Sequence, residues 1–231
     1  MNRICCVVIT ILTGVLPAPA ARADLVVIRG SGGAPETGRV LAAGAALTLP
    51  AGASVTLLGQ DGRILTLAGP YNGNPETGGG GKGTETAALA AVARLLTAGG
   101  ADSGTLGVSR GGSDRNPYAI DHRGGLHCQA ADRAPVFARQ GAGHEARLRI
   151  TSAAGNEAEA VFAEGAGSAP WPAGLLFDDG AYALRTEGQT TPARLTVRRA
   201  PAEARDVVAL TAWMAVHGCA AQARAILARL P

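Results

Sequence analysis

A run of strand and turn signals at residues 38–70 constrains the fold of this chain more than any other stretch. Residues 54–59 (SVTLLG) and 63–68 (RILTLA) are short and rich in leucine and β-branched residues, which is typical of strands. The Asp61-Gly62 pair between them tolerates positive φ, and such a pair favours a tight turn. The sequence therefore predicts a β-hairpin at 54–68.

Turn signals also flank this hairpin. Pro50-Ala51-Gly52 suits a turn, because proline fixes φ early and glycine accepts positive φ later. It joins a third predicted strand, at 46–49, to the hairpin. Gly69-Pro70 is expected to end the ladder, since proline has no amide hydrogen to donate. The spacing alone is equally compatible with any β meander.

The order of these residues carries a family resemblance. A glycine, a Pro-Ala-Gly turn, a strand, an Asp-Gly turn and a strand ending in Gly-Pro follow one another at Gly38, Val40, Gly44, Leu47, Leu49, Pro50, Ala51, Gly52, Val55, Leu57, Asp61, Gly62, Leu67, Gly69 and Pro70. This pattern resembles the FecR-type periplasmic β domain, which implies a periplasmic β fold here. FecR proteins carry a cytoplasmic anti-sigma segment and a spanning helix before this domain. Neither is predicted here, so signalling across a membrane is not carried over.

Residues 1–23 have the pattern of a cleaved export signal. Arg3 is basic, residues 4–16 are apolar but too short to span a bilayer comfortably, and Ala21-Arg22-Ala23 fits the small-residue cleavage rule. We predict cleavage after Ala23 and a periplasmic or secreted mature protein. No later segment reaches the roughly 20 apolar residues of a spanning helix, so no membrane insertion is expected after cleavage.

The charge balance excludes two classes of partner. Loss of Arg3 and Arg22 with the signal lowers the 21 basic residues to 19, against 18 acidic ones. A nearly neutral chain gives no argument for binding nucleic acid or anionic lipid. Aromatic residues make up only 3% of the chain, so the cores must consist of alanine, valine and leucine, which favours two small domains over one.

The cysteines predict a covalent link. Only Cys128 and Cys219 remain after cleavage, and two thiols in an oxidising compartment usually pair. A disulfide closing so long a loop stabilises a fold by roughly 4–5 kcal/mol in the chain-entropy model. Two buried free thiols are the alternative.

The fold class predicted for the whole chain is mainly β with α. A FecR-like β domain with a Gly-rich linker covers 24–83, and a linking helix covers 84–100. In that helix Leu89, Val92 and Leu96 share one face, and Gly99-Gly100 is expected to stop it. A β-sandwich domain at 101–200 and a C-terminal helical hairpin at 201–231 complete the chain. The linker, residues 71–83, contains too much glycine for regular structure.

Short strands about ten residues apart predict the sandwich. The candidates are 105–109, 125–129, 135–138, 146–152, 158–163, 175–177, 182–186 and 194–198. At 146–152, polar Arg147, Arg149 and Thr151 alternate with apolar residues, which predicts one solvated face. The arrangement of Trp171, Asp179-Gly180 and Tyr182 resembles immunoglobulin-like modules, and implies that the two aromatics are core and corner residues.

The C-terminal hairpin is predicted from two helices, 201–216 and 220–230, separated by Gly218. Apolar stripes run along both, at Val207, Leu210 and Met214 and at Ala223, Ile226, Leu227 and Leu230. We expect the hairpin to fold back onto the sandwich, where the disulfide would hold it.

Two motifs suggest catalysis or nucleotide binding, but neither fits its context. Residues 107–111 match G-x-S-x-G, with Ser109 as the nucleophile, yet a nucleophile elbow needs a helix directly afterwards and 112–117 cannot begin one. A serine hydrolase using Ser109 remains a remote alternative. Residues 78–84 (GGGGKGT) resemble a phosphate loop, but Gly83 separates Lys82 from Thr84. We predict no cofactor.

A metal site is also not predicted. His122, His127 and Cys128 lie close in sequence, with Asp121 or His144 as further ligands, but their spacing fits no established zinc pattern. We therefore expect no catalytic, cofactor or metal residues, and name only the disulfide residues Cys128 and Cys219. The predicted function is an exported, non-enzymatic binding or regulatory module that recognises another envelope protein. The alternative is a cell-wall or polysaccharide-binding module, which needs aromatics on an exposed face.

Overall fold

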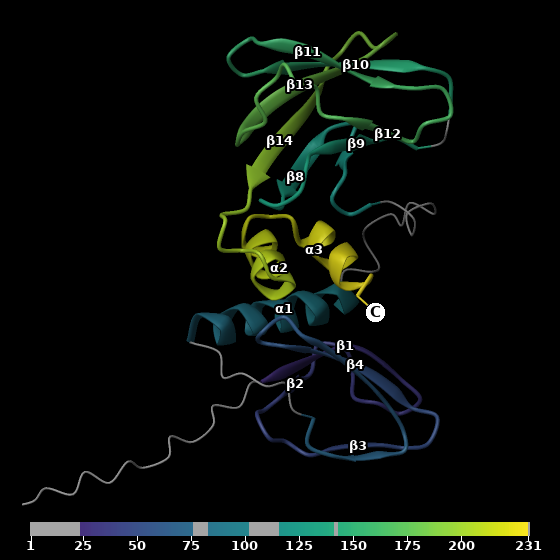
Figure 1. The fold of residues 1–231 in the computed structure, drawn as a ribbon, viewed down its shortest axis with the longest axis vertical. Helices are drawn as coiled ribbons and strands as arrows, with labels where there is room; N and C mark the ends of the chain where they lie inside the picture. Colours follow the sequence, from purple (N-terminus) through teal and green to yellow (C-terminus); the bar gives the residue numbers. More distant parts are fainter. Residues whose placement is uncertain (1–23, 76–82, 102–115, 141–142, 231) are drawn as a thin grey trace, which may run out of the picture.

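The computed structural model describes residues 24–75, 83–101, 116–140 and 143–230. Strands dominate and helices accompany them, so the predicted class, mainly β with α, is confirmed. In Figure 1 the helices lie in the middle of the molecule, between the N-terminal strands and the strands of residues 120–199. The predicted export signal and most of the glycine run of the linker lie outside the described residues.

The N-terminal β unit contains two ladders. An antiparallel sheet has the order β2-β1-β4-β5, made of β1 (Leu25–Ser31), β2 (Val40–Leu41), β4 (Ser54–Gly59) and β5 (Ile64–Ala68). Gly62 has a φ of 77° and Gly52 a φ of 80°, so both predicted turns are confirmed. The predicted hairpin is the β4–β5 pair.

The second ladder corrects two expectations. β3 (Leu47–Leu49) does not join the β4–β5 hairpin; it pairs with β6 (Tyr71–Gly73), which the glycine content had placed in a linker. The reason lies at Gly69, whose N–H donates to the carbonyl of Ala53 at 2.8 Å. A Cβ on Gly69 would collide with the backbone of Pro50. This close approach turns the chain back beside β3.

Both faces of β1 and β4 are buried. Leu25, Val27 and Leu57 point into a core shared with β3, while Val26 and Leu58 point the other way, towards the helices. Strands buried on both faces must be apolar at consecutive positions, as Leu25-Val26-Val27 and Leu57-Leu58 are in this sheet.

The helices form a layer over this second face. They are α1 (Gly83–Ala101), α2 (Val207–Val216) and α3 (Ala220–Leu227). α1 continues through Gly99-Gly100, which were expected to stop it. α2 begins at Val207 and not at 201, because the carboxylate of Asp206 caps it by accepting a hydrogen bond from Ala209 N at 2.8 Å.

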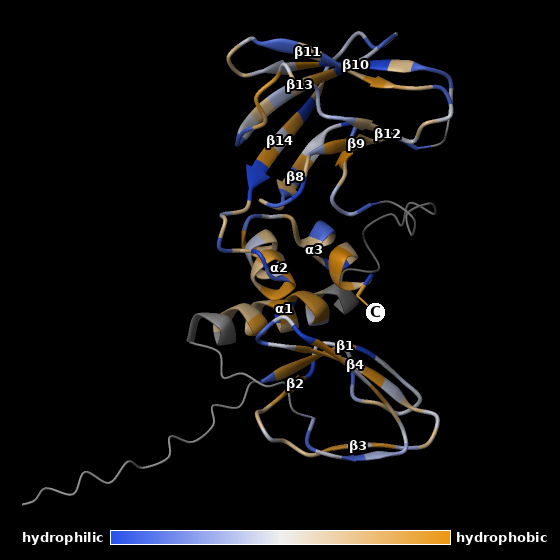
Figure 2. Cartoon of the chain, viewed as in Figure 1, coloured by the Kyte–Doolittle hydropathy of each residue, from blue (hydrophilic) through white to orange (hydrophobic). Residues whose placement is uncertain are grey.

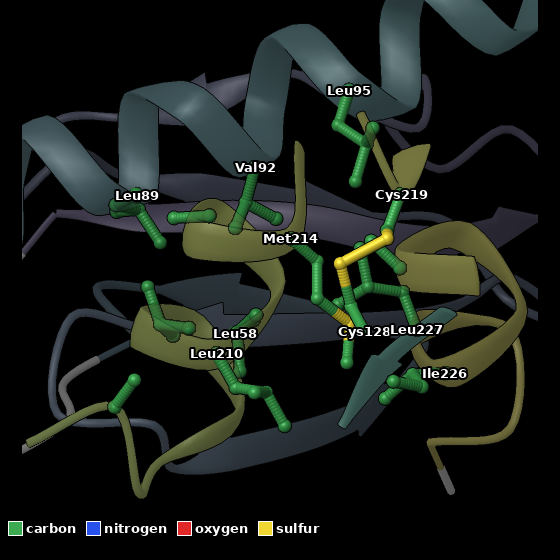
Figure 3. Packing of buried hydrophobic residues seen from close by; sticks show 14 of the residues in the cluster. Leu58, Leu89, Val92, Leu95, Cys128, Leu210, Met214, Cys219, Ile226 and Leu227 are labelled. Atoms are coloured by element: carbon green, nitrogen blue, oxygen red, sulfur yellow. A yellow bond between two sulfur atoms is a disulfide. The ribbon is translucent and has the colours of Figure 1, made fainter. Parts of the chain in front are cut away.

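The expected contact of the helical hairpin with the sandwich is present at β8, where the disulfide and Gln222 hold Cys128, but most of the hairpin packs elsewhere. It packs against α1 and the N-terminal sheet, in a core that Figure 3 shows from close by. Leu89 and Val92 project from α1 towards α2, on which Met214 lies, and Leu95 projects towards Cys219; all of them are buried. α2 is apolar at almost every position, so its stripe could not show which neighbour it would meet.

The disulfide is confirmed, and it joins this helix layer to the sandwich. Cys128, in β8 (Gly125–Gln129), bonds to Cys219 at the start of α3, with Cα atoms 6.2 Å apart. Both cysteines are buried in the same core as the helices. The covalent link therefore lies inside the contact between the helix layer and the sandwich, as Figure 3 shows.

Residues 120–199 form two sheets around a separate core. The large sheet has the order β11-β10-β13-β14-β8, and a smaller one has the order β12-β9-β7. Their strands are β7 (Ile120–Asp121), β9 (Val136–Ala138), β10 (Ala146–Ser152), β11 (Glu157–Phe162), β12 (Ser168–Pro170), β13 (Gly180–Thr186), β14 (Ala193–Arg199) and β8. The enclosed core includes Phe137, Ile150 and Leu184. We call this unit the sandwich.

The predicted strand at 175–177 is wrong, because side chains hold this segment as a loop. Trp171 Nε1 donates to the carbonyl of Leu175 at 2.8 Å. The Tyr182 hydroxyl accepts from Asp178 N at 2.9 Å and lies 3.0 Å from the Asp178 carbonyl, to which it donates. Both aromatics belong to the sandwich core, as expected. The predicted strand at 105–109 lies outside the described residues.

Among the helices that the structure describes, none has both the length and the apolar character required to span a membrane.

Candidate binding surface

The residues considered for metal binding are distributed over different environments. Cys128 forms the disulfide with Cys219, so it has no free thiol to bind a metal. His122 Nδ1 lies 3.2 Å from the carbonyl of Ala138 and 3.4 Å from Asp121 Oδ1. Within the described ranges, no three histidine, cysteine or carboxylate side chains come together as metal ligands would. Ser109 and Lys82 lie outside the described residues.

His127 is buried on the sandwich side of β8. Its Nε2 lies 3.0 Å from Gln129 Oε1, and Gln129 in turn donates to the carbonyl of Arg133 at 2.8 Å. Burial lowers the pKa of His127, against the smaller opposing effect of the Gln129 bond. The imidazole is therefore neutral at pH 7 and serves packing inside the sheet.

Asp121 forms a local ion pair at the end of β7. Burial tends to raise the pKa of this carboxyl, but the hydrogen bonds and positive charge of Arg123, helped by His122, outweigh burial and lower the pKa. Arg123 Nη2 donates to Asp121 Oδ2 at 2.7 Å. The pair holds the turn after β7, and a small hollow of about 40 Å³ lies beside it.

Arginines gather on the outer face of the large sheet. Residues alternate along each strand, so Leu148, Ile150 and Leu184 point into the core and their neighbours point out. The outward arginines, which we call the arginine face, are Arg147 and Arg149 of β10, Arg185 of β13, and Arg194 and Arg198 of β14. All five are exposed. In Figure 2 hydrophilic and hydrophobic residues follow one another along β14.

Acidic residues neutralise only one side of this face. Arg149 lies 3.5 Å from Glu159 of β11, and Arg147 lies 3.7 Å from the same carboxylate. Glu157 is engaged by the hydroxyl of Thr151 at 3.2 Å. Across the part of the chain that the structure describes, no ion pair involves Arg185, and the same holds for Arg194 and Arg198. The face therefore carries an excess of positive charge.

Arg149 and Arg185 stand directly opposite each other in the β10–β13 ladder. Side chains at opposed positions have Cβ atoms about 4.5–5.5 Å apart, and like charges there destabilise a sheet. The side chains of Arg147 and Arg149 are 58% and 52% exposed, so solvent and a ligand both reach them. Arg149 is already paired with Glu159, whereas Arg185 makes no ion pair among the described residues, so together the two guanidinium groups can still bind a further anion.

Two hollows lie on this face. The first, of about 340 Å³, is lined by Arg147, Arg149, Arg185, Glu159 and the turn residues 186–189. The second, of about 310 Å³, is mainly apolar and includes Thr151, Ala181, Ala183, Pro192 and Arg194. Both are open to solvent, as binding surfaces for a protein segment are, and neither encloses a small molecule.

The surface offers no stacking platform for sugars. None of the outward residues of the large sheet is aromatic. Trp171 is stacked on Phe137 with ring centroids 5.3 Å apart, and it meets the edge of Tyr182 at 5.2 Å, inside the sandwich. Tyr118 is covered by the guanidinium of Arg133, 3.8 Å from the ring centroid.

Sequence reasoning found one strand of this face and missed the face itself. The alternation at 147–151 predicted a solvated side, and that side is confirmed. The same period recurs in ALRT and ARLTVRR, at β13 and β14. Only the strand order reveals that the three segments are neighbours, because β11, β12 and their loops separate β10 from β13 in the chain.

Comparisons with protein-family models, with curated proteins and with solved structures found no match for this chain.

Proposed function

We propose that this protein is an exported, non-enzymatic binding module that recognises an acidic segment of another envelope protein through the arginine face. The observation that carries the proposal is the opposed pair of Arg149 and Arg185 on an exposed sheet face. The pair costs folding stability, and nothing in the sandwich core requires it. Binding of a carboxylate repays that cost, because two guanidinium groups then share one anion.

The location rests on different observations. The export pattern at 1–23 and a buried disulfide both support an oxidising compartment outside the cytoplasm. The resemblance of residues 38–70 to FecR-type domains supports a periplasmic setting and a role in contacts between envelope proteins. In this proposal the N-terminal unit and the helix layer hold the sandwich, and the sandwich presents the arginine face.

A protein partner is favoured over the polysaccharide alternative. Sugar recognition relies on exposed aromatic rings, and the outward side of the large sheet has none. Glu157 and Glu159 of the neighbouring strand β11 also border the face with negative charge, which a long phosphate backbone running past them would meet. A short acidic protein segment matches both its charge and its size.

The test is crosslinking of the mature protein in envelope extracts, with two double variants of equal charge change. Arg149→Ala/Arg185→Ala removes the opposed pair, while Arg63→Ala/Arg94→Ala removes two exposed arginines from other parts of the molecule. We expect an acidic protein to be crosslinked by the wild type and by the control variant, and lost with the face variant. The amount of crosslinked partner should fall as the salt concentration is raised, because salt screens the attraction between charges.

Two outcomes would contradict the proposal. Equal crosslinking by the face variant and the control would remove the arginine face from recognition. Retention by purified peptidoglycan, with no protein partner, would instead support the polysaccharide alternative.

A further inference from the structure

The two hollows on the arginine face lie one after the other along the same pair of strands. Arg149 and Thr151 are two positions apart on β10, and Arg185 and Ala183 are two positions apart on β13. The first hollow is lined by the arginines and the second by Thr151 and the alanines. The charged hollow and the apolar hollow are therefore displaced from each other along the strand direction.

The spacing between them follows from strand geometry. Two residues of a strand span about 7 Å, so the opposed pair Arg149 and Arg185 is separated by roughly that distance from the opposed pair Thr151 and Ala183. Side chains on one side of any extended peptide recur at the same interval, because successive side chains point to opposite faces. An extended segment lying along β10 and β13 would place alternate side chains into successive hollows.

Short side chains line much of the apolar hollow. Ala181 and Ala183 of β13 contribute to it together with Pro192 and Arg194. Ala183 lies opposite Thr151 on one side and Arg194 on the other. A valine or leucine at either alanine position would fill the space, so a small apolar group of a ligand fits there.

Resting on the proposed function, we infer that the partner presents an extended segment with an acidic residue and a small apolar residue two positions apart. The carboxylate accepts hydrogen bonds from Arg149 and Arg185, and the apolar side chain enters the hollow over Ala181 and Ala183. Charge selects an acidic partner, and the second hollow selects among acidic sequences. The pattern distinguishes this surface from one that binds any polyanion.

The experiment uses the full mature protein and three labelled peptides in a fluorescence anisotropy titration. In the patterned peptide, glutamate and valine stand two positions apart among serines. The shifted peptide has the same composition with the two residues adjacent, and the third peptide replaces valine with serine. We expect the patterned peptide to bind on the order of tenfold more tightly than either of the others.

Two variants separate this inference from the proposed function. Ala183→Leu fills the apolar hollow, and should abolish the preference for the patterned peptide while preserving weak binding of all three. Ala181→Leu provides the same test at a second position if the first variant does not fold. Arg149→Ala/Arg185→Ala should abolish binding of all three.

The outcomes are distinguishable. Equal affinities for the patterned and shifted peptides, with binding still lost in the double arginine variant, would overturn the inference and leave acidic recognition intact. Unchanged binding by the double arginine variant would overturn both. Tighter binding of an anionic oligosaccharide or a DNA strand than of every peptide would also overturn both.

Discussion

The side-chain amide of Gln222 makes hydrogen bonds to both backbone groups of Cys128. Gln222 Oε1 accepts from Cys128 N at 3.0 Å, and Gln222 Nε2 donates to the Cys128 carbonyl at 2.7 Å. β8 is the edge of the large sheet, and its other side pairs with β14. Gln222 therefore takes the place of a neighbouring strand, and α3 covers an edge that would otherwise be open to pairing.

Gln222→Leu should lower the free energy of unfolding by about 1–3 kcal/mol, because it leaves a partly buried donor and acceptor without partners. Gln189→Leu, at an exposed position, is the matched control and should change stability little. Urea unfolding followed by circular dichroism measures both. Equal unfolding midpoints for the two variants would show that the edge contact contributes nothing.

Removing the disulfide should destabilise the protein by about 2–5 kcal/mol. The bond closes a loop between residues 91 apart in sequence and lies within the core of the helix layer. The double variant Cys128→Ala/Cys219→Ala avoids an unpaired thiol. Its unfolding midpoint should match that of the reduced wild type, and a midpoint equal to that of the oxidised wild type would contradict the prediction.

His127 should make the protein less stable in mild acid. Burial lowers its pKa below the ordinary value of 6.5, so the unfolded chain binds a proton that the folded chain does not. The contribution of neutral, buried His127 to the free energy of unfolding is fully present above about pH 6.5. It is lost as the pH falls from there towards the pKa of His127 in the folded protein. Thermal midpoints from pH 7.5 to 5 should drop for the wild type. The slope should flatten in His127→Gln and persist in His144→Gln, whose histidine is exposed.

Arg185→Glu should stabilise the sandwich while weakening partner binding. The substitution turns a like-charge pair with Arg149 into an opposite-charge pair, which is worth about 0.2–1 kcal/mol across strands. Arg39→Glu, at an exposed position of the N-terminal unit, is the control and should change neither property. A loss of stability in Arg185→Glu would show that Arg185 has a structural role.

Asp206→Ala should cost about 1 kcal/mol, because it removes the side chain that caps α2. Asp206→Asn keeps an acceptor for Ala209 N and should retain most of the stability. Chemical unfolding of the two variants measures the difference. Identical losses in both would indicate that the charge of Asp206, and not its hydrogen bond, stabilises the helix.

Local chemistry made some elements predictable. The strand at 146–152 was predicted with its observed bounds, because polar and apolar residues alternate without interruption. The turn at Gly62 followed from the tolerance of glycine for positive φ. The disulfide followed from counting, since the predicted removal of residues 1–23 leaves Cys128 one possible partner. The strand and the turn depend on interactions within a few residues of sequence. The disulfide spans the chain, but only one pairing of the remaining cysteines was possible.

The remaining features depend on contacts that no local pattern encodes. β3 pairs with β6 because Gly69 packs against the backbone of Pro50, an approach visible only in three dimensions. The helical hairpin meets α1 and the N-terminal sheet as well as β8 of the sandwich, although its apolar stripes alone would suit any of these neighbours. The arginine face needs the order of β10, β13 and β14, which the sequence does not state.

The core under the helices draws on both ends of the described chain, and this has a consequence for biosynthesis. A ribosome completes the strands carrying Val26 and Leu58 long before it reaches α2 and α3, which cover them. Until α2 and α3 are made, the apolar side chains on this face of the N-terminal sheet are not covered by them. Newly made chains therefore remain vulnerable to misassociation until the final helices arrive, and a premature stop codon in α2 would damage the earliest strands as well as the last.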